Sequence, residues 1–218
     1  ILNDLDRKIA GGDKGLGGRL MITTTDAIFP AFAADIGAFQ RTYPNIITDI
    51  VITNDQLDLD QREADIAVRA SNQPPPDLVG RRVCGVHFGI YATRSVANEA
   101  ASKPFDRRQW LGLEYPLTLS LVGEWMDTTI PSNRMVLRAS SFVALCELAG
   151  HGLGHAILPR FVGDAAPGLV RIPCDFDLPT VGLWLLSHRD ILGSRRVRTG
   201  TDFLYRSLKS KRTKFEGS

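Results

Sequence analysis

Short polar side chains gather at the ends of several stretches whose residue pattern predicts strands. They are Thr23–Asp26, Thr53–Asn54 and Arg69–Ser71 in the first half of the chain, and Ser140–Ser141 before a helical stretch in the second half. Hydroxyl and amide groups offer directional hydrogen bonds. A helix N-terminus adds unpaired N–H groups and a partial positive charge, which together suit a small carboxylate or phosphate. Each cluster alone is more simply a helix cap or a turn. Because such clusters recur in both halves, a ligand site remains an equal alternative.

Residues for bond-breaking chemistry are not arranged in any recognisable way. The chain has four histidines but no G-x-S-x-G nucleophile elbow. In "HGLGH", His151 and His155 stand four apart, as two metal ligands on one helix would. The glycines between them favour a helix end followed by a strand, and no Glu completes an H-E-x-x-H motif. We therefore predict no catalytic residue, no metal and no cofactor.

The composition is that of an ordinary globular protein, with 44% hydrophobic and 23% charged residues among 218. A net charge of +2 gives no global reason to expect nucleic acid as a partner. Cys84, Cys146 and Cys174 are odd in number and too widely spaced for a zinc site, which favours reduced thiols in a cytoplasmic protein. No window has the ~18 uninterrupted apolar residues of a membrane span. Residues 1–18 lack the apolar core of a secretory signal.

Strands and helices alternate along the first half of the chain. We predict strands at 20–24, 45–53, 65–70 and 83–93, and helices at 27–42 and 55–64. The stretch "NIITDIVIT" is β-branched and mostly apolar, as in a strand that is buried on both faces. Asp26 is placed to cap the helix that follows the first strand. This alternation indicates right-handed crossovers and a mainly parallel sheet.

The second half repeats the alternation after a polar stretch at 97–108. Strands are predicted at 134–139, 153–159, 169–173 and 181–187, and helices at 140–152, 160–165 and 194–210. We therefore expect an α/β protein of two Rossmann-like lobes with mainly parallel central sheets. The first lobe would comprise 17–92 plus 189–212, and the second 93–188. The chain would thus cross near 93 and return near 188.

Three motifs follow one another in a specific order: "DLDQREADIAVR", "AGHGLGHAILP" and "SRRVRTGTDFL". The stretches "GGRLMIT" and "LVGRRVCGVHFGIYAT" stand before and between them. In this order and spacing, residues 17 to about 208 resemble the effector-binding domain of LysR-type transcriptional regulators. Residues 1–16 are similar to the end of that family's linker helix and a hinge. The family's N-terminal winged helix-turn-helix domain is absent from this chain.

The resemblance implies a fold like that of type II periplasmic binding proteins, with a small-molecule effector between the lobes. Carried over by position, the effector-binding residues would be Thr24, Thr25, Thr53, Asn54, Arg69, Ser71, Ser140, Ser141 and Phe142. The effector is expected to be a polar or anionic metabolite, with Arg69 as the partner of a carboxylate. The family also implies a homo-dimer or tetramer formed through the two lobes. DNA would be bound only through the missing domain, and no membrane contact is implied.

Two other classes of function are alternatives. A periplasmic-type solute-binding protein of a transport system shares the two-lobed architecture. The missing signal peptide counts against it, and so do the helical residues 1–10 and the glycines that follow them. An enzyme on this fold has no supporting arrangement of residues. We therefore predict a cytoplasmic, non-enzymatic effector-binding and oligomerisation domain that modulates DNA binding and transcription.

Overall fold

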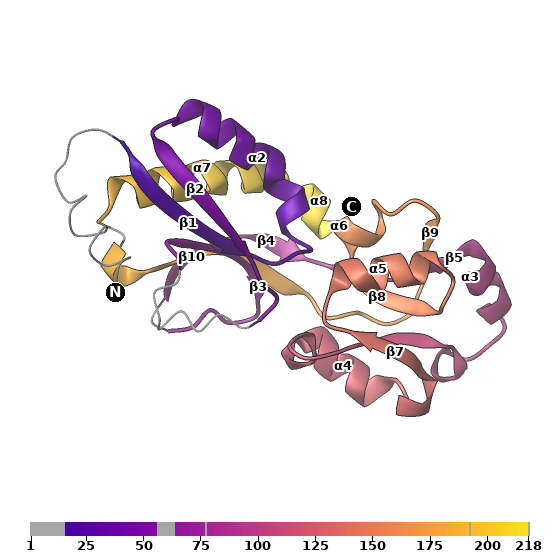
Figure 1. Ribbon diagram of the computed structural model, residues 1–218. Coiled ribbons are helices and arrows are strands. Elements are labelled where there is room, and N and C mark those ends of the chain that lie inside the picture. The colour runs from indigo at the N-terminus through magenta and orange to yellow at the C-terminus, as the bar shows by residue number, and fades with distance from the viewer. Residues whose placement is uncertain (1–15, 56–63, 77, 192, 218) are drawn as a thin grey trace.

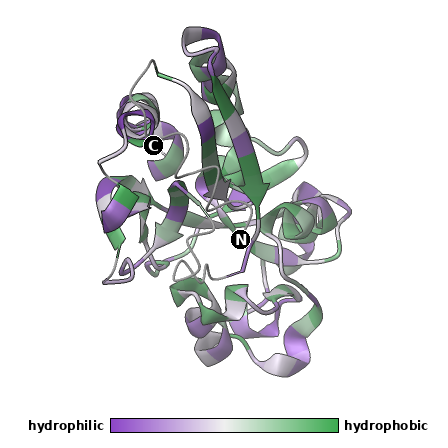
Figure 2. Cartoon of the chain, turned by 60° about the vertical axis from the view of Figure 1, so that its left-hand side comes forward, coloured by the Kyte–Doolittle hydropathy of each residue, from purple (hydrophilic) through white to green (hydrophobic). Residues whose placement is uncertain are grey.

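The computed structural model describes residues 16–55, 64–76, 78–191 and 193–217. The linker helix and hinge expected at 1–16, and the helix expected at 55–64, lie almost entirely outside these residues. Figure 1 shows two lobes, each built on a sheet with helices packed against it. Figure 2 shows that the helices carry both hydrophobic and hydrophilic residues, as helices with one buried face do.

The described part of the first lobe contains a five-stranded sheet with the order β2-β1-β3-β10-β4. Its strands are β1 (Gly18–Thr24), β2 (Ile46–Ile52), β3 (Ile66–Ser71), β4 (Leu78–Val86) and β10 (Val181–His188). Strand β1 pairs in parallel with β2 and β3, whereas β10 pairs antiparallel with β3 and β4. Four of these five strands therefore run in one direction, and β10 runs against them.

The described part of the second lobe contains a five-stranded sheet with the order β7-β6-β8-β5-β9. Its strands are β5 (Phe88–Thr93), β6 (Trp110–Leu113), β7 (Met135–Ala139), β8 (His155–Pro159) and β9 (Leu169–Ile172). Strand β6 pairs in parallel with β7 and β8, and β5 pairs antiparallel with β8 and β9. One strand of five again runs against the others. The mainly parallel α/β architecture expected from the sequence is confirmed for both lobes.

The crossings between the lobes differ from those expected. Strand β5 belongs to the second sheet and β10 to the first, so the chain crosses at His87 and returns between Ile172 and Val181. The boundaries expected at 92/93 and 188/189 are therefore wrong. Residues 83–93, expected as one strand, are the end of β4 and the whole of β5. Because the residues on both sides of His87 are buried, the apolar pattern continues through the crossing.

Helices cover the sheets and complete the core. They are α2 (Phe29–Thr42), α3 (Arg94–Ala100), α4 (Leu121–Thr129), α5 (Phe142–Gly150), α6 (Arg160–Gly163), α7 (Arg195–Ser210) and α8 (Arg212–Glu216). Short 3₁₀ turns lie at Phe105–Arg107, Leu117–Leu119, Ser132–Arg134 and Arg189–Ile191. The long helix α7 buries Val197, Leu204 and Leu208. A Cβ on Gly200 would lie 2.7 Å from a methyl of Leu20, so this glycine lets α7 approach β1 closely.

Helix α2 begins without the cap expected from the sequence. Ile28 occupies the N-cap position, and no side chain caps the helix. The prediction that Asp26 caps α2 is therefore wrong. Pro30 lies in the first turn, where its missing N–H costs nothing, and Phe32 and Phe39 face the core. The carboxyl group of Asp26 instead points across to the second lobe, as described below.

The end of the chain packs against both lobes at the crossing, where α8 lies beside α6 (Figure 1). The rings of Phe161 and Phe215 are 4.9 Å apart between centroids. The guanidinium of Arg160 donates to the carbonyl oxygens of Phe88 at 3.1 Å and Gly217 at 3.0 Å. The backbone N–H of His87 donates to the Phe215 carbonyl at 3.3 Å. These contacts fix the C-terminal turn next to the segment that joins the lobes.

Candidate functional site

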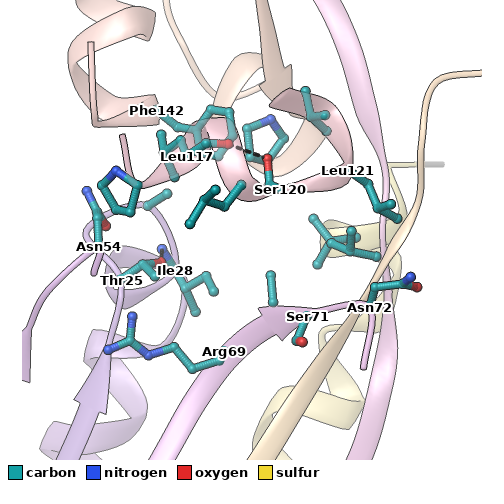
Figure 3. Close-up of a pocket in the computed structure, with 18 of the residues that line it drawn as sticks. Thr25, Ile28, Asn54, Arg69, Ser71, Asn72, Leu117, Ser120, Leu121 and Phe142 are labelled. Carbon is teal, nitrogen blue, oxygen red and sulfur yellow. Dashed lines mark hydrogen bonds between the residues drawn. The ribbon is translucent and has the colours of Figure 1, made fainter. Parts of the chain in front are cut away.

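A cavity of about 520 Å³ lies between the two lobes. Its walls come from the ends of β1, β2 and β3 in the first lobe and from the starts of α4 and α5 in the second. Figure 3 shows these side chains facing one another across the space. Cavities of roughly 300–1,000 Å³ hold ligands of drug-like size. The space therefore fits a small organic molecule.

Five of the nine residues expected at the effector site line this cavity. They are Thr25, Asn54, Arg69, Ser71 and Phe142, and Figure 3 labels all five. The remaining four are Thr24, Thr53, Ser140 and Ser141, and the lining does not include them. The structure thus brings the expected strand ends and the start of α5 together. The side chains of the five lining residues face the cavity, whereas those of the other four residues are not part of its lining.

Thr24 lies behind the wall, in the core of the first lobe. Its side chain is 0% exposed, and its Oγ1 has no hydrogen-bond partner among the described residues. Thr24 follows Leu20 and Ile22 at every second position of β1, so the three side chains share one buried face. Thr25, the first residue after the strand, places its hydroxyl in the lining. This hydroxyl accepts the backbone N–H of Ile28 at 3.4 Å.

Arg69 ties the ends of the three parallel strands together. Its Nη1 donates to the Thr53 carbonyl at 2.6 Å, and its Nη2 donates to Thr23 Oγ1 at 2.9 Å. Burial lowers the pKa of Arg69 to about 10, while the charge of Asp55 acts in the opposite direction. The guanidinium is therefore still protonated at neutral pH. Its Nε has no hydrogen-bond partner among the described residues.

Hydrogen bonds cross the cleft at the start of α5. The Ser141 hydroxyl donates to a carboxylate oxygen of Asp26, and the same hydroxyl oxygen accepts the Ala144 N–H at 3.0 Å. The Asn54 side-chain amide donates to the Ser140 carbonyl at 3.0 Å. Asn54 also accepts the Asp26 backbone N–H at 3.3 Å. Ser141 therefore caps α5 and links the lobes, and Ser140 takes part through its backbone.

Much of the remaining lining is apolar and was not expected from the sequence. It includes Ile28 at the start of α2 and Phe88 on β5. It also includes Leu117, in the turn before α4, and Leu121, the first residue of α4. The rings of Phe88 and Phe142 lie 5.7 Å apart between centroids. No element was expected at 109–133, so β6 and α4 were missed. The signal was Ser120 before "LVGEWM", a capping serine whose Oγ accepts the Gly123 N–H at 3.1 Å.

Other groups with reactive potential lie outside the cavity. Among the described residues, no three His, Cys, Asp or Glu side chains come together as a metal site would require. The helix end and strand expected at "HGLGH" are confirmed, with exposed His151 as the C-cap of α5 and buried His155 on β8. Burial raises the pKa of Cys84 to about 11 and also raises that of Cys146. No helix in the described ranges is both long and apolar enough to cross a bilayer.

Comparison with known proteins relates this geometry to one family. The model of the LysR substrate binding domain matches residues 13–209. The regulatory domain of CrgA, a LysR-type transcriptional regulator from Neisseria meningitidis, is 22% identical with a TM-score of 0.73, over 88% of this chain and 99% of that chain. The full-length virulence activator AphB from Vibrio cholerae is 21% identical with a TM-score of 0.73, over 93% of this chain and 73% of that chain. No curated protein is significantly similar to the chain.

A third solved structure contains a ligand. The CcmR regulatory domain from Synechocystis PCC6803, in complex with 2-PG, is 18% identical with a TM-score of 0.73, over 88% of this chain and 98% of that chain. At such identities the solved structures show a shared fold, whereas the family model spans most of the sequence. The chain therefore belongs to the LysR substrate-binding domain family, the effector-binding domains of LysR-type transcriptional regulators.

Proposed function

We propose that this chain is the effector-binding and oligomerisation domain of a cytoplasmic LysR-type transcriptional regulator, and that it is not an enzyme. The observation that carries the proposal is the cavity between the lobes, because both lobes supply its walls. The ligand in the related CcmR domain supports a small-molecule effector for this fold. The alternative of a transport receptor is not favoured, since the family model that matches is that of regulators.

The effector acts through the spacing of the lobes. A ligand that contacts both walls binds best at one distance between the lobes, here between Thr25 and Asn54 on one side and Phe142 on the other. Binding therefore shifts the population of lobe arrangements toward that distance. Any change in spacing alters the bonds from Asp26 and Asn54 to the start of α5. The lobes of a regulator also carry the contacts between copies, so a change in spacing moves the attached DNA-binding domains.

Pairing with a second copy is proposed through the edge of the first sheet. Strand β2 lies at that edge and exposes Ile47 at 61%, Val51 at 42% and Ile52 at 48%. An exposed apolar edge strand is unfavourable in water and is usually covered by a partner. DNA contact is assigned to a separate winged helix-turn-helix domain of the full regulator, as the family implies.

A ligand screen tests the effector site. The 218-residue chain is screened against small metabolites by thermal unfolding, and each hit is repeated with Leu121→Asp, which places a charge in the wall. A ligand at 100 times its Kd adds about 2.7 kcal/mol of stability, so an effector raises the Tm of the native sequence and not of this variant. Leu153→Asp is the matched control, because Leu153 is exposed and lies outside the lining. Hits that stabilise all three proteins equally would refute a ligand site in the cleft.

A further inference from the structure

We infer that the effector of this protein is an uncharged, predominantly apolar molecule rather than the small anion that its strand-end hydroxyls indicate. This inference rests on the proposed effector site and concerns the chemistry of its ligand. Three features of the cavity carry it: the charges in the lining, the hydrogen bonds already made by the groups that could bind an anion, and the apolar surface of the walls.

The charged residues of the lining would repel an anion. The described residues that line the cavity include three acids, Asp26, Asp55 and Glu124, and one basic residue, Arg69. The guanidinium already has the charge of Asp55 nearby. The local charge is therefore negative by two, with Asp26 partly buried and Asp55 and Glu124 exposed, and this charge disfavours a bound anion.

The two serines that cap helices beside the cavity are already bonded within the protein. At the start of α5, Ser141 accepts the Ala144 N–H and donates to Asp26, so a carboxylate of the chain itself occupies this helix end. At the start of α4, the Ser120 hydroxyl accepts the Gly123 N–H and donates to the Leu117 carbonyl. Neither capping serine therefore has its hydroxyl proton available for an effector.

Arg69 is already partly bonded within the first lobe. Its Nη1 and Nη2 each use one N–H to donate to an oxygen of that lobe, and its Nε, which has no partner in the described structure, has almost no exposed surface. One further N–H is left on each Nη, and it can bond a neutral carbonyl, ether or hydroxyl oxygen. A buried carboxylate needs several donors to offset its lost hydration. The geometry thus matches an apolar body with one neutral acceptor near Arg69.

The walls supply the binding surface for such a body. Ile28 and Phe88 line the space together with Leu117, Leu121 and Phe142. Figure 3 shows Ile28 on one side of the space, and Leu117 and Phe142 on the other. Burial of apolar surface drives binding without any charge on the ligand. A flat molecule of two or three rings would contact both walls within about 520 Å³.

Two fluorescent probes that differ by one charged group test the inference. N-phenyl-1-naphthylamine is neutral, and 8-anilino-1-naphthalenesulfonate has the same rings with a sulfonate. Both are titrated against the 218-residue chain, its Leu121→Asp variant and its Leu153→Asp variant. We expect the neutral probe to bind at least about tenfold more tightly than the sulfonate. Its binding should be lost in Leu121→Asp and kept in Leu153→Asp, whose altered side chain lies outside the lining.

A conservative pair of variants separates charge from hydrophobicity. Glu124→Gln removes one acid from the lining, so it should tighten sulfonate binding by about threefold. Glu147→Gln removes an exposed acid of α5 outside the lining and should leave sulfonate binding unchanged. Sulfonate binding that equals or exceeds that of the neutral probe, and that is lost in Leu121→Asp, would overturn the inference and leave the effector site intact. If neither probe responds to Leu121→Asp, the effector site and the inference both fail.

Discussion

The contact between Asp26 and Ser141 makes a quantitative prediction about the coupling of the lobes. Ser141→Ala removes the cap of α5, which costs about 1 kcal/mol, and a hydrogen bond to a partly buried carboxylate, which costs about 1.5 kcal/mol more. Asp26→Ala removes the same hydrogen bond by deleting its acceptor, the Asp26 carboxylate. The free energies of unfolding of the single and double variants should therefore show a coupling of about 1.5 kcal/mol between the two residues.

Denaturant unfolding of the four proteins in this double-mutant cycle measures the coupling. Ser120→Ala is the matched control, because Ser120 caps α4 through the Gly123 N–H at 3.1 Å and makes no bond to Asp26. Ser120→Ala should cost about as much as any lost helix cap, roughly 1 kcal/mol, yet be additive with Asp26→Ala. A coupling between Asp26 and Ser141 below about 0.5 kcal/mol would refute the cross-cleft contact as a stabilising interaction.

Three further predictions concern groups away from the cleft. Burial lowers the pKa of His155, so below about pH 6.5 the unfolded chain binds a proton that the native state does not. The free energy of unfolding should thus fall as the pH drops from 7 to 5, and it should fall less in His155→Gln. At pH 8 iodoacetamide should modify exposed Cys174 and spare Cys84, whose buried thiol has a pKa of about 11, as peptide mass spectrometry would show. Ile52→Lys on the edge of the first sheet should lower the sedimentation coefficient at micromolar concentration if copies pair there.

The sequence was most informative where local pattern and burial agree. The amphipathic spacing of Val197, Leu204 and Leu208 predicts a helix at 194–210, and α7 spans Arg195–Ser210. The run at 45–53 predicts a strand, and β2 spans Ile46–Ile52. That run was expected to be buried on both faces, however, and Ile52 is exposed. An apolar run identifies a strand but does not show whether it lies at the centre or at the edge of its sheet, because the edge is set by pairing with distant strands.

The crossings between the lobes depend on interactions that no local pattern contains. Residues 83–93 are mostly apolar, yet the chain leaves one sheet and enters another at His87. Both β4 and β5 are buried near this residue, so their composition does not change at the crossing. Strand β6 is only four residues long, Trp110–Leu113, which is too short for an alternation to be recognised. These elements are defined by their partners in the sheet.

Alternation along β1 explains why one expected effector residue is in the core. The side chains of Leu20 and Ile22 are 0% exposed, and Thr24 lies two residues after Ile22 on the same face of the strand. The next side chain on the opposite face is Thr23, which bonds to Arg69, and the first side chain free of the strand is Thr25. Counting by two from Leu20 would have assigned Thr24 to the core face, whereas Thr23 on the opposite face is also buried. The sequence therefore contained the assignment of Thr24 but not that of Thr25.

In the second lobe, a serine caps each of the two helices that begin at the cavity, and this arrangement determines the chemistry of the wall. Ser120 and Ser141 each turn the hydroxyl back to cap the helix. The residues that follow them, Leu121 and Phe142, face the cavity. Each serine thus caps the helix that follows it, and the apolar residue after it faces the cavity. Ser141, one of the polar residues that first indicated an anion site, therefore stabilises a helix beside a cavity whose second wall is largely apolar.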